Sequence, residues 1–85
     1  MTRYRIELRP AAVRALRKIE PAMRSRIQGV IALLASDPRP PAARRLVGRA
    51  AWRVRVGDYR VIYTVEEDVL LIVVVTIGRK SAAIP

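Results

Sequence analysis

Apolar and charged side chains alternate over residues 3 to 8. Tyr4, Ile6 and Leu8 fall on one side of an extended chain, and the charged residues fall on the other. A period of two is the pattern of a half-buried strand. The first strand is therefore expected over residues 3–8.

The chain then changes to the helical period. Pro10 fits the first turn of a helix, where its missing N–H would have no partner in any case. Val13, Leu16 and Ile19 recur at helical spacing, with basic residues between them. These residues predict a short amphipathic helix that ends at about Glu20.

A second helix is expected directly after the first. Pro21 interrupts the chain and suits the first turn of a new helix, and the apolar positions from Met23 to Leu34 keep the helical period. Residues 36–41 include three prolines, which remove backbone donors and favour extended conformations before them. A helical hairpin followed by a connecting loop is therefore predicted.

The period returns to two beyond the segment Leu46-Val47-Gly48. Residues 52–56 alternate between apolar side chains and arginine, Gly57-Asp58 can turn the chain, and residues 59–65 follow as a run rich in β-branched and aromatic side chains. Two such runs joined by a short glycine-containing turn predict a β-hairpin.

A third strand is expected after the hairpin. A turn at residues 66–68 precedes an aliphatic run from Val69 to Ile77, whose hydrophobicity is typical of an inner strand. Helices that precede most of the strands indicate an α+β domain. We expect a single domain over residues 1–85, in the order β-α-α-β-β-β, with the helical hairpin packed on a small antiparallel sheet.

Composition narrows the choice of partner. The 85 residues carry 17 lysines and arginines against 7 acidic residues, a net charge of +10, and 15 of the basic residues are arginine. This charge attracts an anionic partner, and the planar guanidinium suits phosphate. Cysteine and histidine are absent, so no zinc site, disulfide or cofactor is expected. No apolar run reaches the ~18 residues of a membrane span, which favours a cytoplasmic location without a membrane partner.

Three arginines of the hairpin converge if Gly57-Asp58 is a two-residue turn. Arg55 then lies opposite Arg60, and Arg53 shares their face of the sheet. Like charges opposed across a ladder oppose folding, and a bound polyanion would remove the conflict. The trio is therefore a candidate phosphate-binding site, although any one of these side chains alone is more typical of a solvated sheet face.

The hairpin also carries three aromatic residues, Trp52, Tyr59 and Tyr63. Aromatic side chains of single-strand binders stack on bases. The same register, however, places Trp52 and Tyr63 with Val54 and Val61, toward the helices. We expect Trp52 and Tyr63 to be core residues rather than a stacking platform.

The run from Trp52 to Tyr63, Trp-Arg-Val-Arg-Val-Gly-Asp-Tyr-Arg-Val-Ile-Tyr, and the later Ile77-Gly78-Arg79-Lys80 resemble the signature half of RelE-type toxins of bacterial type II toxin–antitoxin systems. The predicted strand and helical hairpin also fit this family, so the resemblance covers about residues 3–80. It implies a ribosome-dependent endoribonuclease, an mRNA interferase that cuts mRNA in the A site and inhibits translation. Cleavage in the family is an in-line attack of a ribose 2′-OH on the adjacent phosphate.

The resemblance also assigns site residues. Arg53 and Arg55 stand where members often have lysines, and Arg60 matches the arginine of the Gly-Asp-Tyr-Arg pattern. Arg79 and Lys80 stand where a His-Arg or Lys-Arg pair commonly follows the glycine. The implied catalytic residues are Arg53, Arg55, Arg60 and Lys80, and the same four with Arg79 are the implied contacts to RNA phosphates.

The tail departs from the family, because Ile84 occupies the place of a tyrosine and no proton-transfer group follows. A second hypothesis is therefore a non-enzymatic toxin, either a ParE-like inhibitor of DNA gyrase or a catalytically weakened relative, since one scaffold hosts both activities. A third is a basic nucleic-acid-binding domain, for which neither a recognition helix nor a zinc motif is found.

Partners follow from the same resemblance. Both toxin hypotheses imply a RelB-like antitoxin, an acidic or amphipathic protein encoded next to the toxin, whose helix lies along the toxin's helices or sheet. mRNA on the ribosome is the implied substrate. Operator DNA is expected to be contacted only through the antitoxin.

Overall fold

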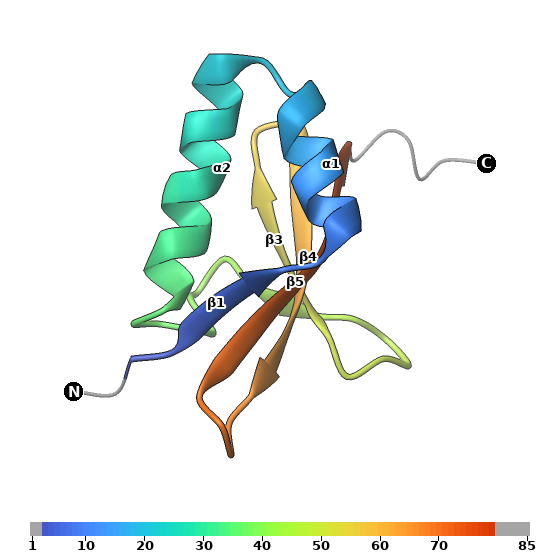
Figure 1. Cartoon of the computed structure of the whole chain (residues 1–85). Coiled ribbons are helices and arrows are strands. Elements are labelled where there is room, and N and C mark those ends of the chain that lie inside the picture. Colours follow the sequence, from blue (N-terminus) through green and yellow to red (C-terminus); the bar gives the residue numbers. More distant parts are fainter. Residues whose placement is uncertain (1–2, 80–85) are drawn as a thin grey trace.

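The computed structural model describes residues 3–79, which form two helices and a five-stranded sheet (Figure 1). Both helices begin at the proline that the sequence indicates; the second ends at Leu34, and the first ends at Lys18, two residues before the expected end. The predicted order is confirmed, with one further strand between the helices and the hairpin. In chain order the elements are β1 (Arg5–Leu8), α1 (Pro10–Lys18), α2 (Pro21–Leu34), β2 (Arg44–Arg45), β3 (Trp52–Val56), β4 (Tyr59–Glu66) and β5 (Leu71–Arg79).

The sheet has the strand order β1-β5-β4-β3-β2. The expectation of a wholly antiparallel sheet was wrong at one edge, because β1 runs parallel to β5, with Ile6 opposite Ile72. The two helices and the strands β2, β3 and β4 all lie between β1 and β5 in the chain, which is more than the length that a parallel pair needs for its crossover. The last strand is an inner strand as expected, but it begins at Leu71, because Val69 and Leu70 belong to the preceding turn.

Both helices pack on the same face of the sheet (Figure 1). Apolar residues at helical spacing, such as Leu16 and Ile27, meet the side chains of the strands that point toward the helices. Within residues 3–79 no helix covers the opposite face, which we call the outer face. Among residues 3–79, no helix has the length and apolar character required to cross a membrane. The largest fully buried side chains are Tyr63, Ile27, Leu34, Ile72, Val61 and Val74.

The turn between β3 and β4 fixes the register of the hairpin. Gly57 has a φ of 60°, whereas Asp58 keeps a negative φ, which is the backbone pattern of a type II′ two-residue turn with glycine first. A Cβ atom at Gly57 would lie 2.7 Å from Cε of Met23 in α2. The backbone angle therefore requires glycine at this position, and any Cβ there would also displace the flexible end of the Met23 side chain.

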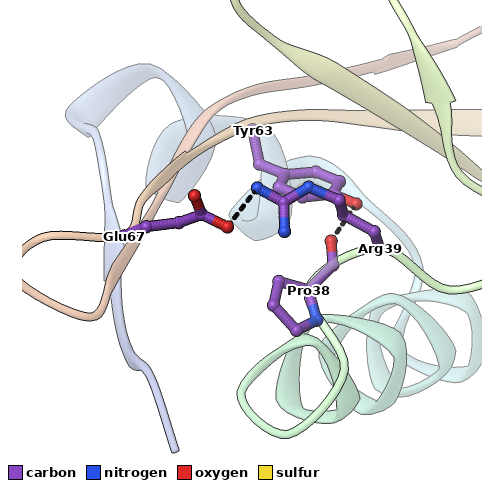
Figure 2. A network of polar contacts seen from close by, with 4 residues as sticks. All are labelled: Pro38, Arg39, Tyr63 and Glu67. Atoms are coloured by element: carbon purple, nitrogen blue, oxygen red, sulfur yellow. Dashed lines mark hydrogen bonds and ion pairs between the residues drawn. The ribbon is translucent and has the colours of Figure 1, made fainter.

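A set of polar contacts holds the loop of residues 36–41, the proline-rich loop, against the sheet (Figure 2). The hydroxyl of the fully buried Tyr63 donates a hydrogen bond of 2.7 Å to the carbonyl of Pro38. Arg39 forms an ion pair of 2.7 Å with Glu67, and its guanidinium carbon lies 5.6 Å from the ring centroid of Trp52. These contacts fix the path of the chain from α2 to β2.

Arg24 of α2 joins the two helices at the end of α1. Its Nε donates to the carbonyl of Leu16 at 2.9 Å, and its guanidinium also donates to the carbonyls of Ile19 at 2.8 Å and Arg17 at 3.3 Å. The last carbonyls of a helix have no partner within the helix, and a cation there interacts favourably with the negative end of the helix dipole. Arg24 therefore has a structural role in the hairpin.

Candidate nucleic-acid interface

The three arginines predicted to converge lie together on the outer face. Arg55 is directly opposite Arg60 across the β3–β4 ladder, and Arg53 is opposite Ile62 on the same side. Val54 and Val61 point the other way and are buried against the helices. The sorting that the two-residue turn predicts is thus confirmed for both faces of the hairpin.

A fourth arginine, which the sequence did not indicate, completes this group. Arg44 of β2 pairs with Arg53 in the ladder, so its side chain shares the outer face. One of its guanidinium nitrogens donates to the carbonyls of Pro41 and Ala43, at 2.7 and 2.9 Å, which fixes the position of its charge. The two-residue strand has no alternation to reveal it. We call Arg44, Arg53, Arg55 and Arg60 the arginine face.

The positive charges of the arginine face act on one another. Burial lowers the pKa of Arg53 below its ordinary value. The other three arginines lower it further, with Arg55 first, then Arg44, then Arg60. Within residues 3–79 the one salt bridge is Arg39–Glu67, so no carboxylate neutralises this face. Four uncompensated cations on a helix-free surface attract anions, which makes this face a candidate anion-binding site.

The other predicted contacts lie apart from this group or outside the described residues. Arg79 is opposite Tyr59 in the β4–β5 ladder, and its guanidinium carbon lies 5.4 Å from the centroid of the Tyr59 ring. Tyr59 also pairs with the buried Val56, so Arg79 belongs to the helix-covered side of the sheet and not to the side that carries Arg53. Lys80 and Ile84 lie outside the described residues.

A hollow of about 460 Å³ adjoins the arginine face. Its floor comes from the outer face of β4 and β5, and its wall comes from the loop that links β2 to β3 and is closed by a hydrogen bond from the Leu46 N–H to the Ala51 carbonyl. Sequence reasoning missed this feature, because no local pattern shows that the loop rises beside the sheet. The lining residues are Leu46, Val47, Arg49, Arg60, Ile62, Thr76, Gly78 and Arg79.

The aromatic residues behave as the sequence predicts. Tyr63 is fully buried and Trp52 is half-buried in contact with the core, so neither is presented on the outer face. Tyr59 is also packed against the core and lies below Arg79. Any base bound at the arginine face would therefore contact aliphatic rather than aromatic side chains.

The chemistry available on the arginine face is electrostatic. Arginine stays protonated throughout the physiological range and acts as a hydrogen-bond donor only. The face can hold a phosphate by paired N–H donors and stabilise negative charge that develops on it. Histidine is absent from the chain, and none of the four arginines is suited to accept a proton.

The chain is thus a small basic α+β protein with a helical hairpin on one face of its sheet and an arginine face on the other. A comparison of the sequence with protein-family models identifies the family of the chain. Residues 6–84 match the family described as the ParE toxin of the type II toxin–antitoxin system parDE. The chain belongs to this family, within the RelE/ParE superfamily of type II toxins. A search of the curated proteins finds no match.

Solved structures agree on the fold. The archaeal RelE–RelB complex from Pyrococcus horikoshii OT3 contains a chain with a TM-score of 0.84 and 29% identity, covering 98% of this chain and 100% of that chain. The intact Escherichia coli RelBE complex gives a TM-score of 0.79 at 20% identity, over 89% of this chain and 95% of that chain. RelBE2 from Mycobacterium tuberculosis gives 0.79 at 20% identity, over 93% of both chains. At 20% identity these last two support the fold alone.

Proposed function

We propose that the chain is a ribosome-dependent endoribonuclease that cleaves mRNA in the A site, and that it acts through the arginine face in the cytoplasm. The observation that carries the proposal is the uncompensated group of Arg44, Arg53, Arg55 and Arg60 on the helix-free face of the sheet. Opposed like charges weaken a ladder, so a group of this kind is better explained by a polyanionic ligand than by stability.

The proposal gives each arginine a role. Arg60, which lies between the arginine face and the hollow, is proposed to bind the scissile phosphate, and Arg53 and Arg55 are proposed to stabilise the charge that develops on it. In-line attack of the 2′-oxygen forms a bond to phosphorus and breaks the bond from phosphorus to the 5′-oxygen of the next nucleotide, which leaves a 2′,3′-cyclic phosphate and a 5′-hydroxyl. Because the arginines do not transfer protons, the 2′-OH loses its proton to water, and the 5′-oxygen takes a proton from water. The proposed role of the ribosome is to hold the RNA in the reactive geometry.

The proposed partner is an acidic antitoxin, since several chains of similar structure come from RelE–RelB complexes. An apolar groove of about 320 Å³ lies between α2, the proline-rich loop and the edge of β3. Leu33 on this groove is 69% exposed, and Arg55 lies at its border. An amphipathic antitoxin segment would bury Leu33 with its apolar side and approach Arg55 with its carboxylates.

The test is expression of the chain in a bacterial host without antitoxin, with mapping of mRNA 5′ ends on ribosomes. We expect growth arrest and new A-site ends, both lost in Arg60→Ala. The matched control is Arg14→Ala, which removes the same charge from the exposed side of α1 and should leave cleavage unchanged. Intact mRNA in arrested cells would reject the proposal.

The second candidate is inhibition of DNA gyrase, which the match to the ParE toxin family favours. It needs no proton transfer from the chain. Purified chain added to a gyrase supercoiling assay separates the two candidates, because an mRNA interferase leaves supercoiling unchanged. Loss of supercoiling together with intact mRNA would establish the second candidate instead.

A further inference from the structure

We propose that the hollow beside the arginine face is a nucleobase pocket, which takes one unstacked base of a single-stranded RNA whose phosphate lies on Arg60. This inference rests on the proposed function, because it concerns the same RNA. The pocket is a further subsite for the same RNA. Its aliphatic walls would hold the base in place of stacking on an aromatic side chain.

The hollow is large enough for a base, and its floor is open beside Arg60. Its volume of about 460 Å³ falls in the range of about 300–1,000 Å³ typical of small-ligand pockets. The floor is the outer face of two paired strands, with Arg60 opposite Gly78 and Ile62 opposite Thr76. Gly78 has no side chain, and a Cβ atom placed there would meet nothing within 4 Å. The glycine therefore leaves open the space directly beside Arg60.

The lining has the chemistry of a base site. Leu46 gives apolar surface from the wall, and Ile62, which is 7% exposed, adds a small apolar area to the floor; both suit the face of a planar ring. The hydroxyl of Thr76 offers one donor and two acceptor lone pairs for the ring edge. Arg49 and Arg60 contribute cations to the same lining, so the phosphate attached to the base has a counter-charge on either side.

Val47 is the least expected part of this lining. It is 99% exposed at the tip of the loop, and Gly48 beside it has a φ of 74°. A fully exposed valine gains nothing from burial in the free protein. At the mouth of the hollow, however, its side chain would cover a bound base and lose its own exposed apolar surface.

The substitution Gly78→Val tests the pocket without removing any charge. A valine side chain fits an inner strand and has open space at its Cβ, so the fold should be kept while the floor of the hollow is filled. Val47→Ser is a second variant, at an exposed tip where it cannot affect folding. Gly29→Ala is the matched control, because Gly29 on the exposed side of α2 also has open space around its Cβ.

The probes are two fluorescent RNA hexamers with the same backbone, one with all its bases and one with abasic riboses at the two central positions. Binding is followed by fluorescence anisotropy at low salt. We expect the chain to bind the complete hexamer about fivefold more tightly than the abasic one, at the lower end of the range for base contacts because the walls are aliphatic. Gly78→Val should abolish this ratio, Val47→Ser should reduce it, and Gly29→Ala should keep it.

The outcomes separate the pocket from the proposed function. Equal affinity of the unmodified chain for both hexamers would overturn the pocket, as would a ratio that survives in Gly78→Val, and in both cases the phosphate contacts would stand. A retained ratio without cleavage on ribosomes would reject the interferase and keep the pocket. The affinity of Gly78→Val for the abasic hexamer must match that of the unmodified chain, because a lower value would mean that the valine had displaced Arg60.

Discussion

Removing one charge from the arginine face should stabilise the protein, which is the reverse of the usual effect of a substitution. Arg55 lies directly opposite Arg60 and acts on Arg53 as well. A like-charged pair directly opposed in a ladder destabilises by about 0.2–1 kcal/mol. With a second neighbour added, Arg55→Gln should raise the free energy of unfolding by about 0.5–1 kcal/mol at low salt.

The assay is urea unfolding in about 0.02 M and 1 M salt, where the screening length falls to about 3 Å. The gain from Arg55→Gln should vanish at high salt, because the repulsion is then screened. Arg14→Gln on the exposed side of α1 is the control for net charge alone, and we expect it to change stability by less than about 0.3 kcal/mol. Equal effects of the two substitutions, or a loss of stability in Arg55→Gln, would show that repulsion within the arginine face does not lower the free energy of unfolding.

Three further substitutions test the contacts that position the site. Tyr63→Phe removes the bond to the Pro38 carbonyl and should destabilise by about 1–2 kcal/mol at pH 8. Burial raises the pKa of Tyr63 to about 12 from its ordinary 10, so the stability that is present below pH 10 is lost between about pH 10 and 12. Urea unfolding across that window should show this loss in the unmodified chain and not in Tyr63→Phe. Parallel pH profiles of the two proteins would contradict this expectation. Arg24→Ala removes three bonds at the end of α1 and should destabilise by about 1–3 kcal/mol in the same assay, whereas a loss below about 0.5 would show that water replaces them. Gly57→Ala adds a Cβ 2.7 Å from Met23 at a positive φ, and a melting temperature equal to that of the unmodified chain would contradict the expected loss of at least about 1 kcal/mol.

Much of the fold was predictable from local signals. Pro10 and Pro21 mark the helix starts because the missing N–H of proline suits only the first turn. The start of β5 was missed by two residues, since Val69 and Leu70 are as apolar as the strand that follows. Leu70 has a φ of 51°, which no residue preference of leucine indicates. The parallel pairing of β1 was also missed, because it joins residues at opposite ends of the chain and depends on how the helices pack.

The site was predictable in part, for a similar reason. A two-residue turn determines every pair in the hairpin, so the positions of Arg53, Arg55 and Arg60 follow from Gly57 alone. Arg44 joins them through tertiary structure, in a strand too short for a pattern. The hollow depends on a loop whose position beside the sheet is set by packing, and its lining mixes residues from the loop and from two strands.

The central claim is that the arginine face cleaves mRNA held by the ribosome. The most direct measurement adds the purified chain to ribosomes programmed with a defined mRNA, beside the same mRNA without ribosomes, and maps the ends by primer extension. We expect cleavage within the A-site codon only when ribosomes are present, reduced at least about 100-fold in Arg60→Ala and unchanged in Arg14→Ala. Uncut mRNA on ribosomes at any concentration of the chain, or equal cleavage by Arg60→Ala, would contradict the claim.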